Sequence, residues 1–252
     1  MVLISSPELR THFFQKFLTI YLVIFLFGSK VIGQSISNYE KQIWGMASTN
    51  WRLNKKWVFN QDVGLMHTYT TPKFTRVFLR PQINYQLSGT FSFHGGLIFI
   101  LKFYEIDENA MEIRPWVGTK IRWPSFWRVN FLHYVRIEDR FRHTYNEDLW
   151  ENDFRIRYKL SATIPINHES MIDHTFYGVL AYEFFSVSYD VNVQFTTADL
   201  HRFDIGLGFY QNVKNRYEVN LVAFKARDEV TNEYDFSSFV LFLKYKRYIN
   251  WD

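Results

Sequence analysis

The stretch RVNFLHYVRIEDRFR, residues 128–142, indicates the fold class because two kinds of residue alternate along it. Most of the odd-numbered residues suit hydrocarbon, whereas most of the residues between them are charged or polar. Successive side chains of a β-strand point to opposite faces, so a strand would sort these residues onto two different surfaces. One face then holds Val129, Phe131, His133, Val135 and Ile137, and the other holds Arg128, Asn130, Leu132, Tyr134, Arg136, Glu138 and Arg140.

The same period-two pattern recurs along the rest of the chain. Many of the segments exceed the ~5–6 residues of soluble strands and reach the ~9–11 that cross a bilayer. About twelve segments show the pattern, at residues 41–52, 56–68, 74–87, 90–104, 111–122, 127–142, 152–164, 172–184, 186–196, 200–212, 216–227 and 235–247. In the ninth of these, the pattern places Val187 on the apolar face and Asp190 on the polar face. Pro81 and Pro115 fall inside two segments, where each removes a ladder hydrogen bond and indicates a bulge or the end of a membrane-embedded part.

The connections between these segments differ in length. NKK (54–56), SG (88–89) and NVKN (212–215) predict tight turns, whereas IDENAM (106–111) and HTYNEDLWEN (143–152) predict longer polar connections. No Pro-rich or Ser-rich linker interrupts the sequence, so we expect one domain over residues 34–252.

Composition indicates a folded chain of unusual aromatic content. The 252 residues are 47% hydrophobic and 21% charged, and they include 26 Phe, 16 Tyr and 8 Trp. There is no cysteine, which excludes disulfides, thiolate metal sites and a cysteine nucleophile.

The N-terminal segment, residues 1–33, is predicted to be a signal peptide. Arg10 and Lys16 precede the apolar run 17–27, which is too short for the ~20 residues of a spanning helix. Val31 and Gly33 suit a signal peptidase, and the alternative is a retained N-terminal anchor. Cleavage would remove three of the 29 basic and one of the 25 acidic residues, and the near-balanced remainder does not predict nucleic-acid binding.

Two architectures use such alternation. A soluble barrel buries its apolar face, whereas a transmembrane barrel turns that face to lipid and must close so that every backbone group is hydrogen-bonded. The export signal, the strand lengths and aromatic residues near segment ends favour an all-β, antiparallel transmembrane β-barrel of about 12 strands, with a range of 10 to 14. Those aromatic residues are Trp44, Trp51, Trp57, Tyr69, Tyr104, Trp123, Trp127, Trp150, Tyr248 and Trp251.

Several short motifs resemble one family. Over most of residues 40–247, the motifs RPQINYQL (80–87), RIEDRF (136–141), FRIRYKL (154–160) and AYEFF (181–185) resemble an uncharacterised family of Bacteroidota outer-membrane β-barrels, the domain of unknown function 2490. The resemblance implies a location in the outer membrane and provides no catalytic residues. The C-terminal sequence YINWD departs from the usual pattern of outer-membrane proteins, because barrel insertion machinery usually recognises a terminal aromatic residue.

The polar face of the strands forms the predicted lumen lining. It comprises Arg76, Arg80, Arg114, Lys120, Arg122, Arg128, Arg136, Glu138, Arg140, Arg155, Arg157, Lys159, Asp190, Arg202, Asp204 and Glu218. Two interpretations stay open. The carboxylates pair with neighbouring arginines in ladders that fill the interior, or the cationic excess forms a lining that favours anions.

Three stretches invite a chemical interpretation. In NHES (167–170), His168 and Ser170 resemble part of the nucleophile signature of outer-membrane phospholipase A, although Met171 and Ile172 replace its Asn-Gly and Pro165 favours a turn. A zinc protease site needs histidines four apart on a helix, and the histidines of HESMIDH (168–174) are six apart. The carboxylates of residues 138–153 fit no calcium loop and predict a solvated rim.

The sequence therefore predicts an exported outer-membrane barrel without cofactor or metal, which is not an enzyme. Its role is either a narrow solute pathway or a structural and surface element, and the alternative is a lipid hydrolase. The expected partners are outer-membrane lipids, the barrel insertion machinery and a small solute, and not nucleic acid.

Overall fold

The computed structural model describes residues 39–106, 109–146, 148–188, 200–227 and 233–250. Contacts divide the chain into two units, Met1–Asn38 and Tyr39–Asp252, and the described residues all belong to the second. The predicted signal peptide, residues 1–33, lies outside the described residues and stays a prediction. Within the described ranges, no helix is both long and apolar enough to cross a membrane.

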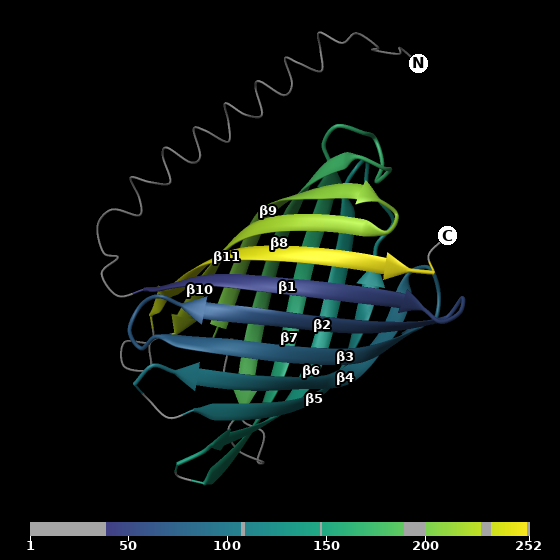
Figure 1. Cartoon of the computed structure of the whole chain (residues 1–252). Coiled ribbons are helices and arrows are strands. Elements are labelled where there is room, and N and C mark those ends of the chain that lie inside the picture. Colours follow the sequence, from purple (N-terminus) through teal and green to yellow (C-terminus); the bar gives the residue numbers. More distant parts are fainter. Residues whose placement is uncertain (1–38, 107–108, 147, 189–199, 228–232, 251–252) are drawn as a thin grey trace, which may run out of the picture. The chain divides into compact units, whose positions relative to one another are not determined.

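Eleven β-strands of the described ranges form a closed barrel (Figure 1). They are β1 (Glu40–Arg52), β2 (Trp57–Thr68), β3 (Phe74–Gln86), β4 (Phe91–Tyr104), β5 (Ala110–Arg122), β6 (Asn130–Thr144), β7 (Leu149–Pro165), β8 (Thr175–Ser188), β9 (Leu200–Asn212), β10 (Asn215–Arg227) and β11 (Tyr234–Ile249). Strands that follow one another in the chain pair in antiparallel fashion, and the barrel closes between β1 and β11, which run in parallel in Figure 1. An odd number of strands requires this parallel pair, so the expectation of a wholly antiparallel barrel is wrong at the closure. We call the barrel end at which β1 begins the N-end, and the end at which β1 and β11 finish the C-end.

The strand count is one below the predicted twelve and within the range of 10 to 14. The predicted segments 172–184 and 186–196 are not separate strands as far as Ser188, because β8 runs through residue 185 and pairs with β7 up to Ser188, and the rest of the second segment lies outside the described residues. Val187 therefore shares the inner face with Glu183 and is buried, at 9% exposed. Its predicted place on the apolar face is wrong.

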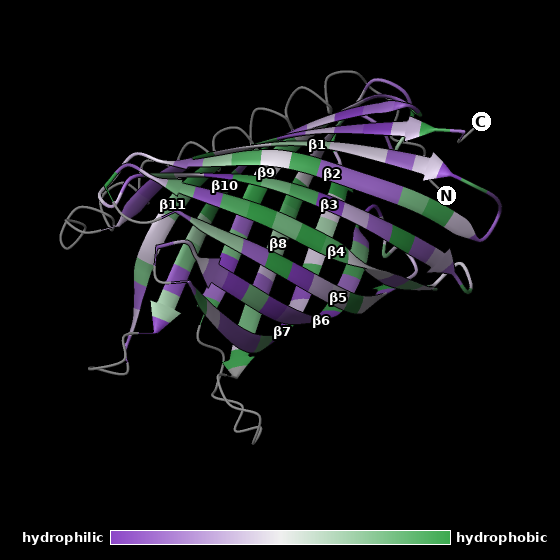
Figure 2. Cartoon of the chain, turned by 60° about the horizontal axis from the view of Figure 1, so that its bottom comes forward, coloured by the Kyte–Doolittle hydropathy of each residue, from purple (hydrophilic) through white to green (hydrophobic). Residues whose placement is uncertain are grey.

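Exposure alternates along the strands. Hydropathy alternates along the same strands, as the colours of Figure 2 show. On β3, Val77 and Leu79 are each 38% exposed, whereas Phe78 between them is 7% exposed. On β6, Val135 is 39% exposed and Glu138 is completely buried. The period-two pattern thus correctly predicted an apolar outer wall and a largely polar inner wall.

Two aromatic clusters nevertheless pack inside the barrel. The first contains Trp44, Val222, Phe224, Val240 and Phe242, and the second contains Phe78, Ile98 and Trp116. Met46 and Met66 pack against both clusters and so connect them. Trp44 was predicted near a strand end at the membrane interface, and this is wrong, because it shares the inner face of β1 with Met46 and Ser48.

Two inner-wall glycines allow aromatic rings to lie against the wall. Gly64 is paired with Phe78 across β2 and β3, and Gly208 with Tyr177 across β8 and β9. A Cβ atom would lie 2.3 Å from the Phe78 ring at Gly64 and 2.2 Å from the Tyr177 ring at Gly208. A side chain at either position would therefore force the facing ring to shift.

Pro81 and Pro115 lie inside β3 and β5, as predicted. The β3–β4 ladder omits Arg80 and Pro81, and the β5–β6 ladder omits Arg114 and Pro115. The same register resumes on both sides of each gap, so the prolines interrupt the ladder without introducing a bulge.

Candidate functional site

The inner wall holds most of the predicted lumen residues. Fourteen of them occupy inner-facing strand positions, namely Arg76, Arg80, Arg114, Lys120, Arg122, Arg136, Glu138, Arg140, Arg155, Arg157, Lys159, Arg202, Asp204 and Glu218. Asp190 lies outside the described residues. Arg128 precedes β6, which begins only at Asn130, and its Nη2 donates to the carbonyl oxygens of Ile166 (3.3 Å) and His168 at the C-end. Its predicted place on a lumen-facing strand is therefore wrong.

Glu138 of β6 is the centre of an ion-pair cluster and is completely buried. Its carboxylate accepts hydrogen bonds from Arg114 Nη1 (3.2 Å), Arg155 Nε (2.9 Å) and Arg157 Nη1 (3.1 Å). Arg136 forms a further ion pair with it from the same strand. Four guanidinium groups from β5, β6 and β7 thus surround one carboxylate, and this excess of positive charge requires further acids nearby.

Two of those acids extend the cluster toward the N-end. Glu112 accepts hydrogen bonds from Arg114 Nε (2.9 Å) and Arg140 Nε (2.7 Å). Asp153 lies 3.3 Å from Arg140 Nη1 and 2.6 Å from Arg142 Nη2. Acids and arginines therefore alternate across β5, β6 and β7, and each acid bridges two or more arginines.

The acidic stretch 138–153 was predicted to form a solvated rim, and this is correct only in part. The side chains of Asp148 and Glu151 are 91% and 57% exposed. Asp153 and Glu138 are buried, because they occupy inner-facing positions of β7 and β6. For these two acids the prediction of a solvated rim is wrong.

A second ladder continues along β7, β8 and β9. Glu183 accepts a hydrogen bond from Arg157 Nε (2.9 Å) and lies 3.8 Å from Arg202 Nη1. Arg202 binds both carboxylate oxygens of Asp204, at 2.6 and 2.8 Å. Lys159 lies 3.7 Å from Asp204. Because Arg157 also contacts the Glu138 carboxylate, the two ladders form one network.

The network also contacts the aromatic clusters. The Arg202 guanidinium lies 5.5 Å from the centre of the Trp44 ring and 5.6 Å from that of Phe224. The Arg136 guanidinium lies 5.0 Å from the centre of the Trp116 ring. Such cation–π contacts favour an arginine that has been removed from water.

Two smaller groups of ion pairs lie apart from the network. Arg80 Nε donates to Asp62 Oδ2 at 2.7 Å. Glu218 lies 3.3 Å from Lys244 Nζ and 2.5 Å from Lys246 Nζ.

Eight ion-paired residues at inner-facing strand positions within the described ranges were not among the predicted lumen residues. They are Asp62, Glu112, Arg142, Glu151, Asp153, Glu183, Lys244 and Lys246. All have the inner-facing parity of their strands, so the alternation itself was the signal that could have found them.

The stretch with the hydrolase resemblance lies in the connection between β7 and β8. His168 and Ser170 are outside any strand, as the prediction of a polar turn required. Among the described residues, no hydrogen bond joins their side chains, and no group of three potential ligands could hold a metal ion.

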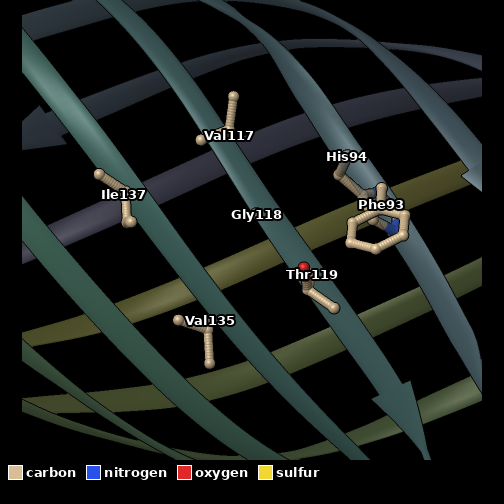
Figure 3. A pocket seen from close by; sticks show the side chains of 7 residues that line it. All are labelled: Phe93, His94, Val117, Gly118, Thr119, Val135 and Ile137. Atoms are coloured by element: carbon tan, nitrogen blue, oxygen red, sulfur yellow. The ribbon is translucent and has the colours of Figure 1, made fainter.

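A hollow of about 350 Å³ lies in the barrel wall at β4, β5 and β6 (Figure 3). Phe93, Val117 and Ile137 line it from the outer face. A second hollow of about 350 Å³, at β1, β10 and β11, is lined by Gly45, Val219 and Leu243 among others. Both are largely apolar, and the second also has Glu218 and Lys244, the ion pair described above, in its lining.

Comparison with known proteins identifies the family. No curated protein matches the chain in sequence. Residues 41–225 match the family described as protein of unknown function (DUF2490), which covers β1 through most of β10. Since this match spans well over half of the 252 residues, the chain belongs to the uncharacterised β-barrel family DUF2490.

Proposed function

We propose that this chain is an outer-membrane β-barrel with a closed interior, which acts as a structural or surface element of the membrane and not as an open channel or an enzyme. Its expected surroundings are outer-membrane lipids, and the insertion machinery assembles it there. The outer wall supports the membrane location. Val117, Leu207 and Leu221 are 60%, 54% and 54% exposed although they lie inside strands. A continuous exposed apolar surface of this kind suits lipid and not water.

The burial of Glu138 carries the proposal of a closed interior. A carboxylate in a water-filled channel would be exposed to solvent, yet Glu138 is 0% exposed among four arginines. Arg136 is 3% exposed and Trp116 is 4% exposed on the same part of the wall. Barrels of about eight strands are filled by side chains and those of 16–18 strands hold an aqueous channel, so eleven strands can be closed by long arginines.

Conductance in a planar bilayer tests the closed interior. The full chain, expressed with its N-terminal segment and purified from membranes in detergent, should insert without producing discrete current steps. Insertion is verified by the slower electrophoretic migration of the heated chain. The variant Phe78→Ala/Trp116→Ala, which empties one aromatic cluster, serves as the positive control and should pass ions.

The narrow solute pathway is the competing function. Discrete anion-selective steps from the unaltered chain, reduced when Arg136 and Arg140 are neutralised, would support that pathway and refute the closed interior. Lipase activity abolished by Ser170→Ala would instead support the hydrolase alternative. Membrane fractionation tests the location, because the chain should sediment with outer-membrane and not inner-membrane markers.

A further inference from the structure

The C-end of the inner wall contains two cations that form no ion pair within the part of the chain that the structure describes. Lys120 and Arg122 occupy adjacent inner-facing positions at the end of β5. Neither forms an ion pair with any residue that the structure describes, in contrast to the arginines around Glu138. The Lys120 ammonium lies 5.0 Å from the centre of the Tyr134 ring.

Other charged groups around Lys120 add to the excess of positive charge at this end of the barrel. Arg80, Arg122 and Arg136 all add positive charge at Lys120, and Asp62 is the acid that opposes them. Asp62 is already bound by Arg80, at 2.7 Å from its Nε. Like charges repel one another, so the free energy of the folded chain falls when an anion joins them.

His94 provides a second, independent indication of a ligand. Its side chain is 7% exposed, and its Nε2 lies 2.8 Å from Ser92 Oγ. Its other ring nitrogen, Nδ1, is buried with no hydrogen-bond partner among the described residues. When Ser92 donates to Nε2, Nδ1 carries the proton and becomes a free donor. A buried donor without a partner costs free energy that a ligand oxygen would recover.

The strand register brings these groups together. Lys120 is paired with Ser92 across β4 and β5, and His94 is paired with Gly118, where the Tyr134 ring occupies the place of a side chain, 3.0 Å from the position of a Cβ atom. The rings of His94 and Tyr134 meet edge to face, with centroids 6.0 Å apart. Lys120 and His94 thus contact the same tyrosine ring, and Lys120 and Arg122 act electrostatically on His94.

We propose that Lys120, Arg122 and His94 form a binding site for a phosphate group at the C-end of the barrel. An ammonium, a guanidinium fork and a ring N–H supply several donors, which a tetrahedral oxyanion accepts better than a halide does. The phosphate can belong to a free solute or to a lipid headgroup at the barrel rim. The site depends on the barrel alone, so it stands whether or not the interior conducts ions.

Isothermal titration of the full chain, in phosphate-free buffer and a non-ionic detergent, tests the site. One arm titrates inorganic phosphate, and the other titrates phosphatidic acid in mixed micelles. Saturable binding of one phosphate per chain is expected in at least one arm, and the arm in which it occurs identifies the source. Absence of saturable binding in both arms would overturn the proposal.

Variants distinguish the site from general attraction to a basic barrel end. Lys120→Gln/Arg122→Gln should weaken binding at least about tenfold, because two charged donors are lost. The matched control is Lys55→Gln/Lys56→Gln, which removes two exposed charges at the same end and should change affinity less than about twofold. Lys120→Arg should retain binding. Equal losses of affinity from both double variants would overturn the proposal. The single variant Arg122→Gln changes an exposed residue and so repeats the test without disturbing the buried positions.

Discussion

Replacing Glu138 with glutamine tests whether the ion-pair network stabilises the barrel. The substitution keeps the shape of the side chain and removes its charge. Arg114 and Arg157 retain the carboxylates of Glu112 and Glu183, whereas Arg136 and Arg155 lose the carboxylate they contact. Breaking a buried ion pair by removing one partner costs about 3–5 kcal/mol, because an uncompensated charge stays buried.

The assay is urea unfolding of the chain in detergent micelles, followed by tryptophan fluorescence. With a slope of roughly 2 kcal/mol per molar urea, the expected cost lowers the unfolding midpoint by about 2 M. The matched control is Glu151→Gln, since Glu151 is 57% exposed and lies 3.5 Å from Arg142 Nη2. An exposed pair of this kind contributes at most about 1 kcal/mol. Equal midpoint shifts for the two variants, or no shift for Glu138→Gln, would refute the reasoning.

Three further substitutions give comparable tests. Gly208→Ala should lower the free energy of unfolding by about 1–3 kcal/mol through overpacking against Tyr177, whereas Gly178→Ala, whose Cβ would have its nearest neighbour at 4.0 Å, should be nearly neutral in the same urea titration. Leu221→Arg should destabilise the barrel in lipid vesicles by about 2–4 kcal/mol if Leu221 faces the bilayer centre. The control Leu87→Arg, in the β3–β4 connection, should cost less than about 1 kcal/mol. Equal costs for the two variants would contradict the lipid-facing assignment. Arg155→Lys should lower the midpoint less than Arg155→Gln, because a lysine keeps the charge beside Glu138 but not the guanidinium fork, and the reverse order would show that charge is not what matters there.

Most of the barrel could be predicted from the alternation of apolar and polar residues, because each strand has one face on the outer wall and the other face on the inner wall. The faces of β3 and β6 follow directly from the sequence, and the predicted tight turns lie in three C-end connections, residues 53–56, 87–90 and 213–214. These features depend on neighbours in the chain, which the sequence displays directly.

The features that could not be predicted depend on where a strand ends or on which strands are neighbours. Val187 was misassigned because FFSVS contains no residue that marks the end of a strand, so residues 186–196 were assigned as a new segment whose faces followed from polarity alone. Trp44 was misassigned because a tryptophan near a strand end suits both a membrane interface and an inner cluster. The contact of Arg202 with Glu183 follows from the register of β8 and β9, which the pattern along a single strand does not contain.

The parallel pairing of β1 and β11 restricts how this chain could be rearranged. Tyr39 and Asn250 lie beyond opposite ends of the barrel, and β1 alone has 13 residues, or about 40 Å of strand at ~3.3 Å per residue. In a bilayer, the two points would face different compartments. A circularly permuted barrel would therefore need a linker that passes through the membrane or the barrel interior, whereas an even-stranded barrel could be permuted with a short surface loop. Head-to-tail fusion of two copies of the chain is restricted for the same reason. The first copy would end at the barrel end opposite to the one where it began, so the second copy would have to insert in the opposite orientation.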